Sequence, residues 1–187
     1  MERKTLLHLP ISSRGQKVKI ETDVPVLFLA GPIRNAPKWH EDAVAILLEI
    51  NREIFIAAPV RHLRWDLIQL AEKDTGLYQQ FERQRAWEQY YLYAAAQKGC
   101  IVFWLPKESE CKDDIHKVYA HITMMELGQW IARCKTNRGI NLVIGTDGHF
   151  PEWSTIEFEI KTEIPHVRIF STLKETLDAA LLLCGSD

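Results

Sequence analysis

Short apolar runs alternate with amphipathic stretches along most of this chain. Each run ends at glycine, proline or polar residues and has the length of a buried strand in a parallel sheet. We predict five such strands, at residues 24–30, 53–59, 100–105, 141–146 and 166–170. The stretches between the strands repeat apolar residues at helical spacing, which predicts helices at residues 39–52, 77–98, 123–135, 154–163 and 172–184.

This alternation of strands and helices indicates the fold class. It favours a doubly wound, mostly parallel α/β sheet of five strands, with helices on both faces and right-handed crossovers. Ligands of such sheets bind beyond the carboxyl ends of the strands, near the point where the strand order reverses. The segments in which we expect functional residues are therefore 31–39, 60–65, 106–126 and 145–153.

The domain organisation is simple. A chain of 187 residues has the size of one domain. Residues 1–23 form an irregular N-terminal extension in which residues 5–10 are a candidate edge strand, and residues 24–187 form a single α/β domain. Residues 63–75 fit either a short helix or an irregular connection.

Composition excludes several classes of protein. With 23 basic and 25 acidic residues, the chain has no basic excess that would indicate nucleic-acid binding. No apolar stretch is long enough to cross a membrane, and the first residues lack a signal-peptide pattern. The four cysteines form no C-x-x-C pair and the seven histidines no known ligand motif, so we expect no metal site and no disulfide framework. A reducing cytoplasm is the expected location.

The first candidate site follows the first strand. Gly31 and Pro32 end the strand, and a glycine there allows a ligand to approach the backbone closely. Arg34 and Asn35 lie just beyond, where an anionic or hydroxyl-rich ligand could bind. The alternative is a plain connection between strand and helix, because neither a G-x-G-x-x-G fingerprint nor a P-loop lysine is present.

The second candidate is Glu126. The spacing Thr123-x-x-Glu126 is typical of a capping box at the start of a helix. Alternatively, Glu126 is a nucleophile, because a helix N-terminus favours an ionised carboxylate and attack on a sugar anomeric carbon requires one. Gly128, on the same helix, would then allow a neighbouring group to approach closely.

The third candidate is Glu88, in the charged stretch 81–88. If its helix packs beside the start of the Glu126 helix, the two carboxyl groups could lie about 5 Å apart, which suits a retaining, covalent mechanism. The alternative is a solvated charged face, which we favour for Glu82, Arg83 and Arg85.

Other residues have simpler expected roles. Most of the six tryptophans belong to the core or to an interface, and Trp104, beside the end of the third strand, is a candidate wall for a base-binding pocket. His40 and its acidic neighbours are expected on the polar face of a helix start. Further capping boxes are predicted at Ser154-x-x-Glu157 and Thr172-x-x-Glu175.

Taken in order, these motifs resemble the nucleoside 2-deoxyribosyltransferase family. The matching residues are Phe28-Leu-Ala-Gly-Pro32, Trp39, Gln84-x-x-Trp87-Glu88, Ile101-Val-Phe-Trp104-x-Pro106 and Thr123-Met-Met-Glu126-Leu-Gly128-x-Trp130. The similarity spans about residues 24–150. The loop Gly31-x-Ile33-Arg34 also resembles the phosphate-side loop of the 2′-deoxynucleoside 5′-phosphate N-hydrolases, which are distant relatives of that family.

The resemblance implies a flavodoxin-like fold and cleavage of an N-glycosidic bond. Glu126 would attack C1′ to form a glycosyl-enzyme intermediate, which a second base or water then resolves, and Glu88 would assist the leaving base. No cofactor is implied, and a homo-oligomer is expected because a neighbouring subunit often completes the pocket. The substrate contacts that we expect are Gly31, Pro32, Arg34, Asn35, Trp39, Trp104 and Met125.

Two alternatives remain open. The substrate could be a nucleoside monophosphate or NAD, and Arg34 together with Lys38 favours a phosphorylated one. The chain could instead be a nucleotide-binding sensor or regulatory module without catalysis. Lys98-Gly99, which stands where family members often have Ala-Asp, leaves room for this second interpretation.

Overall fold

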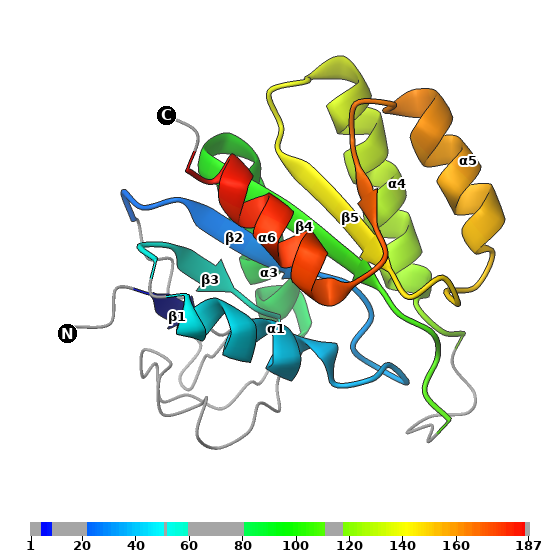
Figure 1. The fold of residues 1–187 in the computed structure, drawn as a ribbon, viewed down its shortest axis with the longest axis horizontal. Helices are drawn as coiled ribbons and strands as arrows, with labels where there is room; N and C mark the ends of the chain where they lie inside the picture. Colours follow the sequence, from blue (N-terminus) through cyan, green and yellow to red (C-terminus); the bar gives the residue numbers. More distant parts are fainter. Residues whose placement is uncertain (1–4, 9–21, 51, 60–80, 111–117, 186–187) are drawn as a thin grey trace.

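The computed structural model describes residues 5–8, 22–50, 52–59, 81–110 and 118–185 (Figure 1). These residues form a six-stranded, all-parallel sheet in the order β1-β3-β2-β4-β5-β6. The strands are β1 (Leu6–His8), β2 (Val26–Ala30), β3 (Phe55–Ala57), β4 (Gly99–Leu105), β5 (Leu142–Thr146) and β6 (Ile169–Phe170). The helices are α1 (Trp39–Glu49), α3 (Phe81–Lys98), α4 (His121–Thr136), α5 (Trp153–Glu163) and α6 (Leu173–Leu183).

The predicted fold class is confirmed. Strands β3-β2-β4-β5-β6 have the strand order of a flavodoxin-like doubly wound sheet. The sheet has one strand more than the five predicted, because β1 from the N-terminal extension pairs with the outer edge of β3. This strand lies within the candidate edge strand at residues 5–10. The ambiguous segment 63–75 and the predicted start of the long helix at 77–80 lie outside the described residues.

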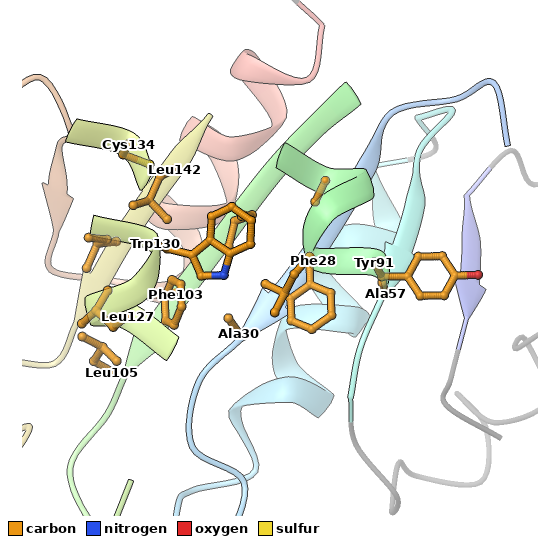
Figure 2. Close-up of a cluster of buried hydrophobic side chains, with 14 of the residues drawn as sticks. Phe28, Ala30, Ala57, Tyr91, Phe103, Leu105, Leu127, Trp130, Cys134 and Leu142 are labelled. Carbon is orange, nitrogen blue, oxygen red and sulfur yellow. The ribbon is translucent and has the colours of Figure 1, made fainter. Parts of the chain in front are cut away.

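Helices cover both faces of the sheet, with α1 and α6 on one face and α3, α4 and α5 on the other (Figure 1). Successive residues of β2 and β4 point to opposite faces, so that Leu27 and Val102 contact the α1–α6 core while Phe28 and Phe103 contact the α3–α5 core. Figure 2 shows part of the α3–α5 core, with Trp130 near its centre. Because both faces of each central strand are buried, the strands appear in the sequence as continuous apolar runs.

The strand order reverses between β2 and β4. The chain leaves β2 towards β3 on one side, whereas β4 leads to β5 on the other. The two strands pair from Val26 with Gly99 to Ala30 with Phe103, so their carboxyl ends lie together. This edge of the sheet is where the topology predicts a ligand site.

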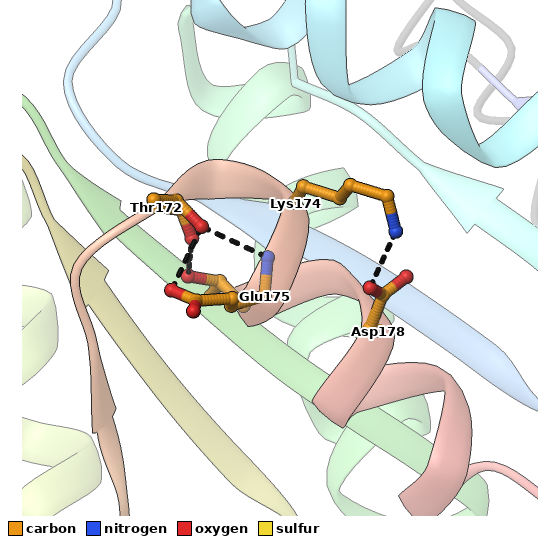
Figure 3. A network of polar contacts seen from close by, with 5 residues as sticks. Thr172, Lys174, Glu175 and Asp178 are labelled. Atoms are coloured by element: carbon orange, nitrogen blue, oxygen red, sulfur yellow. Dashed lines mark hydrogen bonds and ion pairs between the residues drawn. The ribbon is translucent and has the colours of Figure 1, made fainter.

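Two of the three predicted capping boxes do not form. Helix α4 starts at His121, after a left-handed Ala120 at φ 57°, and no side chain caps it. Helix α5 likewise follows a left-handed Glu152 at φ 55°, so Ser154 is inside the helix and does not cap it. At α6 the cap is confirmed, because the Thr172 hydroxyl accepts the backbone N–H of Glu175 at 3.2 Å (Figure 3).

No helix among the described residues is both long and apolar enough to cross a membrane.

Candidate functional site

Glu88 and Glu126 meet at the guanidinium group of Arg85. Arg85 Nη1 donates a hydrogen bond to Oε2 of Glu88 at 2.6 Å and a second one to Oε1 of Glu126. Arg85 and Glu88 lie three residues apart on one face of α3, and Glu126 comes from α4. The structure therefore brings together the two glutamates that the sequence singled out, and we call these three side chains the carboxylate cluster.

The carboxylate cluster lies near the carboxyl edge of the sheet. Helix α3 leads into the start of β4, so its first turns lie towards the opposite, carboxyl ends of the strands. Trp87, between Arg85 and Glu88 in the sequence, packs against Phe28 of β2 with 6.3 Å between the ring centroids. Helix α4 begins beyond the end of β4, and Glu126 is in its second turn. Both glutamates therefore lie at the edge where such folds bind ligands.

The cluster is shielded from water. The side chains of Arg85, Glu88 and Glu126 are 21%, 9% and 12% exposed. Burial disfavours the charged form of Arg85, but the hydrogen bonds and charges of Glu126 and Glu88 outweigh it and raise the pKa of the guanidinium group. Arg85 is thus a permanent cation between two carboxylates.

The shared nitrogen limits how far apart the carboxylates are. Because both oxygens bond to Nη1 of Arg85, they are separated by at most two hydrogen-bond lengths, or about 6 Å. Glycoside-cleaving enzymes that retain configuration have carboxyl groups about 5–5.5 Å apart, whereas inverting ones need about 6.5–9.5 Å. The two bonded oxygens are therefore closer together than the carboxyl groups of inverting enzymes.

Glu126 differs from its expected role as a helix cap. Because α4 begins at His121, Thr123 is a buried residue of the first turn and Glu126 lies beyond it. The field of a helix N-terminus falls off within the first turn, so it contributes little at this position. The positive charge next to Glu126 is instead that of Arg85. The sequence had favoured a position on a solvated, charged helix face for this residue. The Arg85-x-x-Glu88 spacing was the signal that could have identified it.

The loop after β2 packs tightly against the end of β4. Gly31 has a φ of 155°, and a Cβ there would lie 2.4 Å from the carbonyl oxygen of Trp104 and 2.6 Å from the Trp39 ring. The carbonyl of buried Pro32 accepts a 2.9 Å hydrogen bond from Trp39 Nε1. Gly31 and Pro32 therefore allow close packing of two chain segments, and the predicted approach of a ligand to this loop stays a prediction.

Trp39 and Trp104 are core residues. Both belong to the α1–α6 core, on the face of the sheet opposite to the helices that carry the carboxylate cluster. Trp104 packs against Gly145 of the neighbouring strand, where an added Cβ would lie 2.8 Å from the indole. A packing role accounts for both indoles, and their contact with a substrate stays a prediction.

The remaining predicted substrate contacts are one buried residue and two exposed ones. Asn35 is buried in a left-handed conformation with φ 56°, and its carbonyl accepts a 2.6 Å hydrogen bond from the Ser109 N–H, which ties the loop after β2 to the segment after β4. Arg34 is exposed, and Met125, next to Glu126, is 50% exposed. Of the predicted contacts, Arg34 and Met125 are the side chains that a ligand could reach most directly.

Gly128 does not mediate a close contact. A Cβ added there would have no atom within 4 Å, apart from its own helix backbone and chain neighbours. The expected approach of a neighbouring group at this glycine is therefore absent from the described part of the chain.

His40 is buried rather than on a polar helix face. Its ring lies 3.5 Å from that of Trp39, centroid to centroid, and Nε2 has no hydrogen-bond partner in the part of the protein that the structure describes. Burial lowers the pKa of His40 to about 3, although a backbone hydrogen bond at Leu29 opposes the shift. The neutral ring is thus part of the α1 packing surface.

Among the described side chains, no group of three or more His, Cys, Asp or Glu residues is arranged to hold a metal ion. Comparison with models of known protein families finds none that matches this chain, and a search of curated proteins finds no match.

Proposed function

We propose that this protein cleaves the N-glycosidic bond of a nucleoside or nucleotide, with Glu126 as nucleophile and Glu88 as the second carboxylate. The observation that carries the proposal is the meeting of these two glutamates, from different helices, near the carboxyl edge of the sheet. The substrate class rests on the resemblance of the surrounding motifs to nucleoside 2-deoxyribosyltransferases.

The reaction takes place in two displacements. A Glu126 oxygen forms a bond to C1′ as the bond from C1′ to the base nitrogen breaks, and the bonding electron pair leaves with the base. A proton from solvent, which the Glu88 carboxylate can relay, neutralises the base. Water or a second base then attacks C1′ and gives up a proton to the Glu88 carboxylate or to solvent. The bond from C1′ to the Glu126 oxygen breaks and its electron pair stays with the Glu126 carboxylate, which gives hydrolysis or transfer.

The charges of the carboxylate cluster suit this chemistry. One guanidinium and two carboxylates together carry one net negative charge. The transition state for attack at C1′ resembles an oxocarbenium ion, so a nearby net negative charge stabilises it. Because the three side chains are poorly exposed, water screens this interaction less than it would at the surface.

Arg34 and Lys38 favour a phosphorylated substrate. Both lie in the connection between β2 and α1, and both are exposed. We expect Arg34→Ala to lose activity on nucleoside monophosphates while it keeps activity on free nucleosides. An equal effect on both classes would contradict a phosphate contact at Arg34.

The test is chromatographic. The protein is incubated with nucleosides, nucleoside monophosphates and NAD, with and without a second free base, and the released or exchanged base is measured. We expect base release by the wild type to fall by at least about 10³-fold in Glu126→Gln, because no nucleophile remains. Glu159→Gln, an exposed change on α5, is the control and should leave the rate unchanged.

The products decide between the alternatives. A new nucleoside that forms only with the second base identifies a transferase, and base release without it identifies a hydrolase. If no substrate is turned over, the catalytic proposal is wrong. Nucleotide binding detected by calorimetry in that case would support the sensor alternative.

A homo-oligomer in the cytoplasm remains part of the proposal. The exposed apolar residues Val118, Ile122 and Met125, at and just before the start of α4, support a subunit contact beside the cluster. The three described cysteines are free thiols, which is the form that a reducing compartment maintains. Sedimentation of the wild type tests the oligomer directly.

A further inference from the structure

We propose that Arg85 is the positioning residue of this site, and that it acts through Glu126 by holding its carboxylate in the orientation for attack. The inference rests on the proposed function. It goes beyond the expected role of this residue, which was a solvated position on a charged helix face.

The first support is the geometry of the bridge. A terminal guanidinium nitrogen carries two N–H groups, and Nη1 of Arg85 directs one to each carboxylate. Hydrogen bonds between ionised partners are roughly twice as strong as neutral ones, and they restrict the rotamers of both side chains. Arg85 thereby links α3 to α4 through the two groups that the proposed reaction uses.

The second support is the position of Glu126 in α4. It is past the first helical turn, where no cap and no unpaired backbone N–H can orient its carboxylate. A glutamate side chain has several rotatable bonds, and an enzyme can lose about 10²-fold in rate when a reacting group is misplaced by 1 Å. Arg85 therefore supplies an orientation that α4 does not.

The third support is electrostatic. Two poorly exposed carboxylates within about 6 Å of each other repel, and a cation between them is needed to keep both in place. Replacing Arg85 by a neutral residue changes the net charge of the cluster from −1 to −2. The two side chains would then move apart towards water, which removes the alignment of Glu126.

Arg133 provides a matched control. It lies on α4, as Glu126 does, but its guanidinium stacks 5.0 Å from the Tyr93 ring centroid and 4.7 Å from that of Trp130. It also donates a 2.7 Å hydrogen bond to the Tyr93 hydroxyl. Its guanidinium contacts aromatic side chains and not the carboxylate cluster. Arg133→Ala therefore makes the same substitution as Arg85→Ala at a position away from the cluster.

The experiment measures base release by the full-length protein with Arg85→Ala, Arg85→Lys and Arg133→Ala. We expect Arg85→Ala to lower kcat by about 100-fold while KM stays within about threefold, because alignment is lost and binding is not. Arg85→Lys should keep part of the rate, since an ammonium group can donate to both carboxylates. Millimolar methylguanidinium should restore Arg85→Ala at least about tenfold and leave Arg133→Ala, which we expect to be fully active, unchanged.

The outcomes separate this inference from the proposed function. A kcat for Arg85→Ala equal to or above that of the wild type overturns the positioning role while Glu126→Gln remains inactive. An equal loss in Arg85→Lys without rescue by methylguanidinium assigns Arg85 a purely structural role and also overturns it. Absence of base release by the wild type contradicts the proposed function itself. Circular dichroism checks folding, and if Arg85→Ala does not fold, Arg85→Gln takes its place in the rescue.

Discussion

The buried ionisable residues of this protein differ in whether a neighbour of opposite charge compensates them. Arg85, Glu88 and Glu126 are shielded from water but compensate one another, and removing one partner from such a group commonly costs about 3–5 kcal/mol. His40 is shielded from water as well, but none of the described residues places an ionised partner next to its ring. Burial therefore keeps the ring neutral. The carboxylate cluster therefore stays ionised, whereas His40 stays neutral.

The burial of His40 makes stability depend on pH. Its pKa is about 3 in the folded protein and 6.5 when exposed, so between these values the unfolded chain binds more protons. The contribution of His40 to the free energy of unfolding is therefore fully present above pH 6.5. It is lost as the pH drops towards 3, by up to about 1.4 kcal/mol per pH unit. We expect His40→Gln to flatten the fall in unfolding free energy between pH 7 and 4.5.

Urea titrations at several pH values measure this slope. His166→Gln, at an exposed histidine, is the control and should retain the wild-type slope. An unchanged slope in His40→Gln would show that protonation of this ring is not coupled to unfolding.

At the scale of elements, the helices differ in how they begin. Helices α4 and α5 each follow a residue in the left-handed conformation and lack a side-chain cap. Helix α6 follows an extended Thr172 whose hydroxyl caps it and also donates a 2.8 Å hydrogen bond to the Glu175 carboxylate. Figure 3 shows this network next to the Lys174–Asp178 ion pair of the same helix.

This difference predicts unequal effects of two similar substitutions on the free energy of unfolding. Thr172→Ala should lower the unfolding free energy by about 0.5–2 kcal/mol, because the N–H of Glu175 loses its acceptor. Ser154→Ala, at the box that does not form, should change it by less than about 0.5 kcal/mol. Thermal or urea unfolding of both variants checks this, and an equal loss in both would contradict the assignment of the cap.

For the whole molecule, one sheet carries two cores. The α1–α6 core includes Ile56 of β3, and the α3–α5 core includes Ile144 of β5. These residues point to opposite faces and lie three strand spacings apart, or about 14 Å. The central strands contribute side chains to both cores, so neither core can be lost without the other.

We therefore expect the losses in unfolding free energy from one substitution in each core to add, and the protein to unfold in a single transition. Ile56→Val and Ile144→Val should each cost about 0.5–1.5 kcal/mol, and the double variant should equal their sum within about 0.5 kcal/mol. Urea unfolding followed by far-ultraviolet circular dichroism and tryptophan fluorescence should give coincident curves. Separate transitions would mean that the two faces unfold independently.

Local patterns predicted the elements and the fold class. The runs that become β2 and β4 are apolar at every position because both of their faces are buried, and that burial is already visible in the sequence. The edge strand at Leu6–His8 was also within a predicted segment. Glu88 and Glu126 were both selected as candidates, each from its own helix.

Tertiary packing decided which of these residues meet. Arg85 and Glu126 are 41 positions apart in the chain, and no local period links them. The sequence predicts Trp104 as a candidate pocket wall, and burial in the core has the same local pattern, because an aromatic residue near a strand end can serve either role. His40 was read as polar, although α1 turns it inward. The sequence alone carries the periodicity of burial, because that is a property of neighbouring residues, whereas contacts between distant helices arise only when the sheet brings them together.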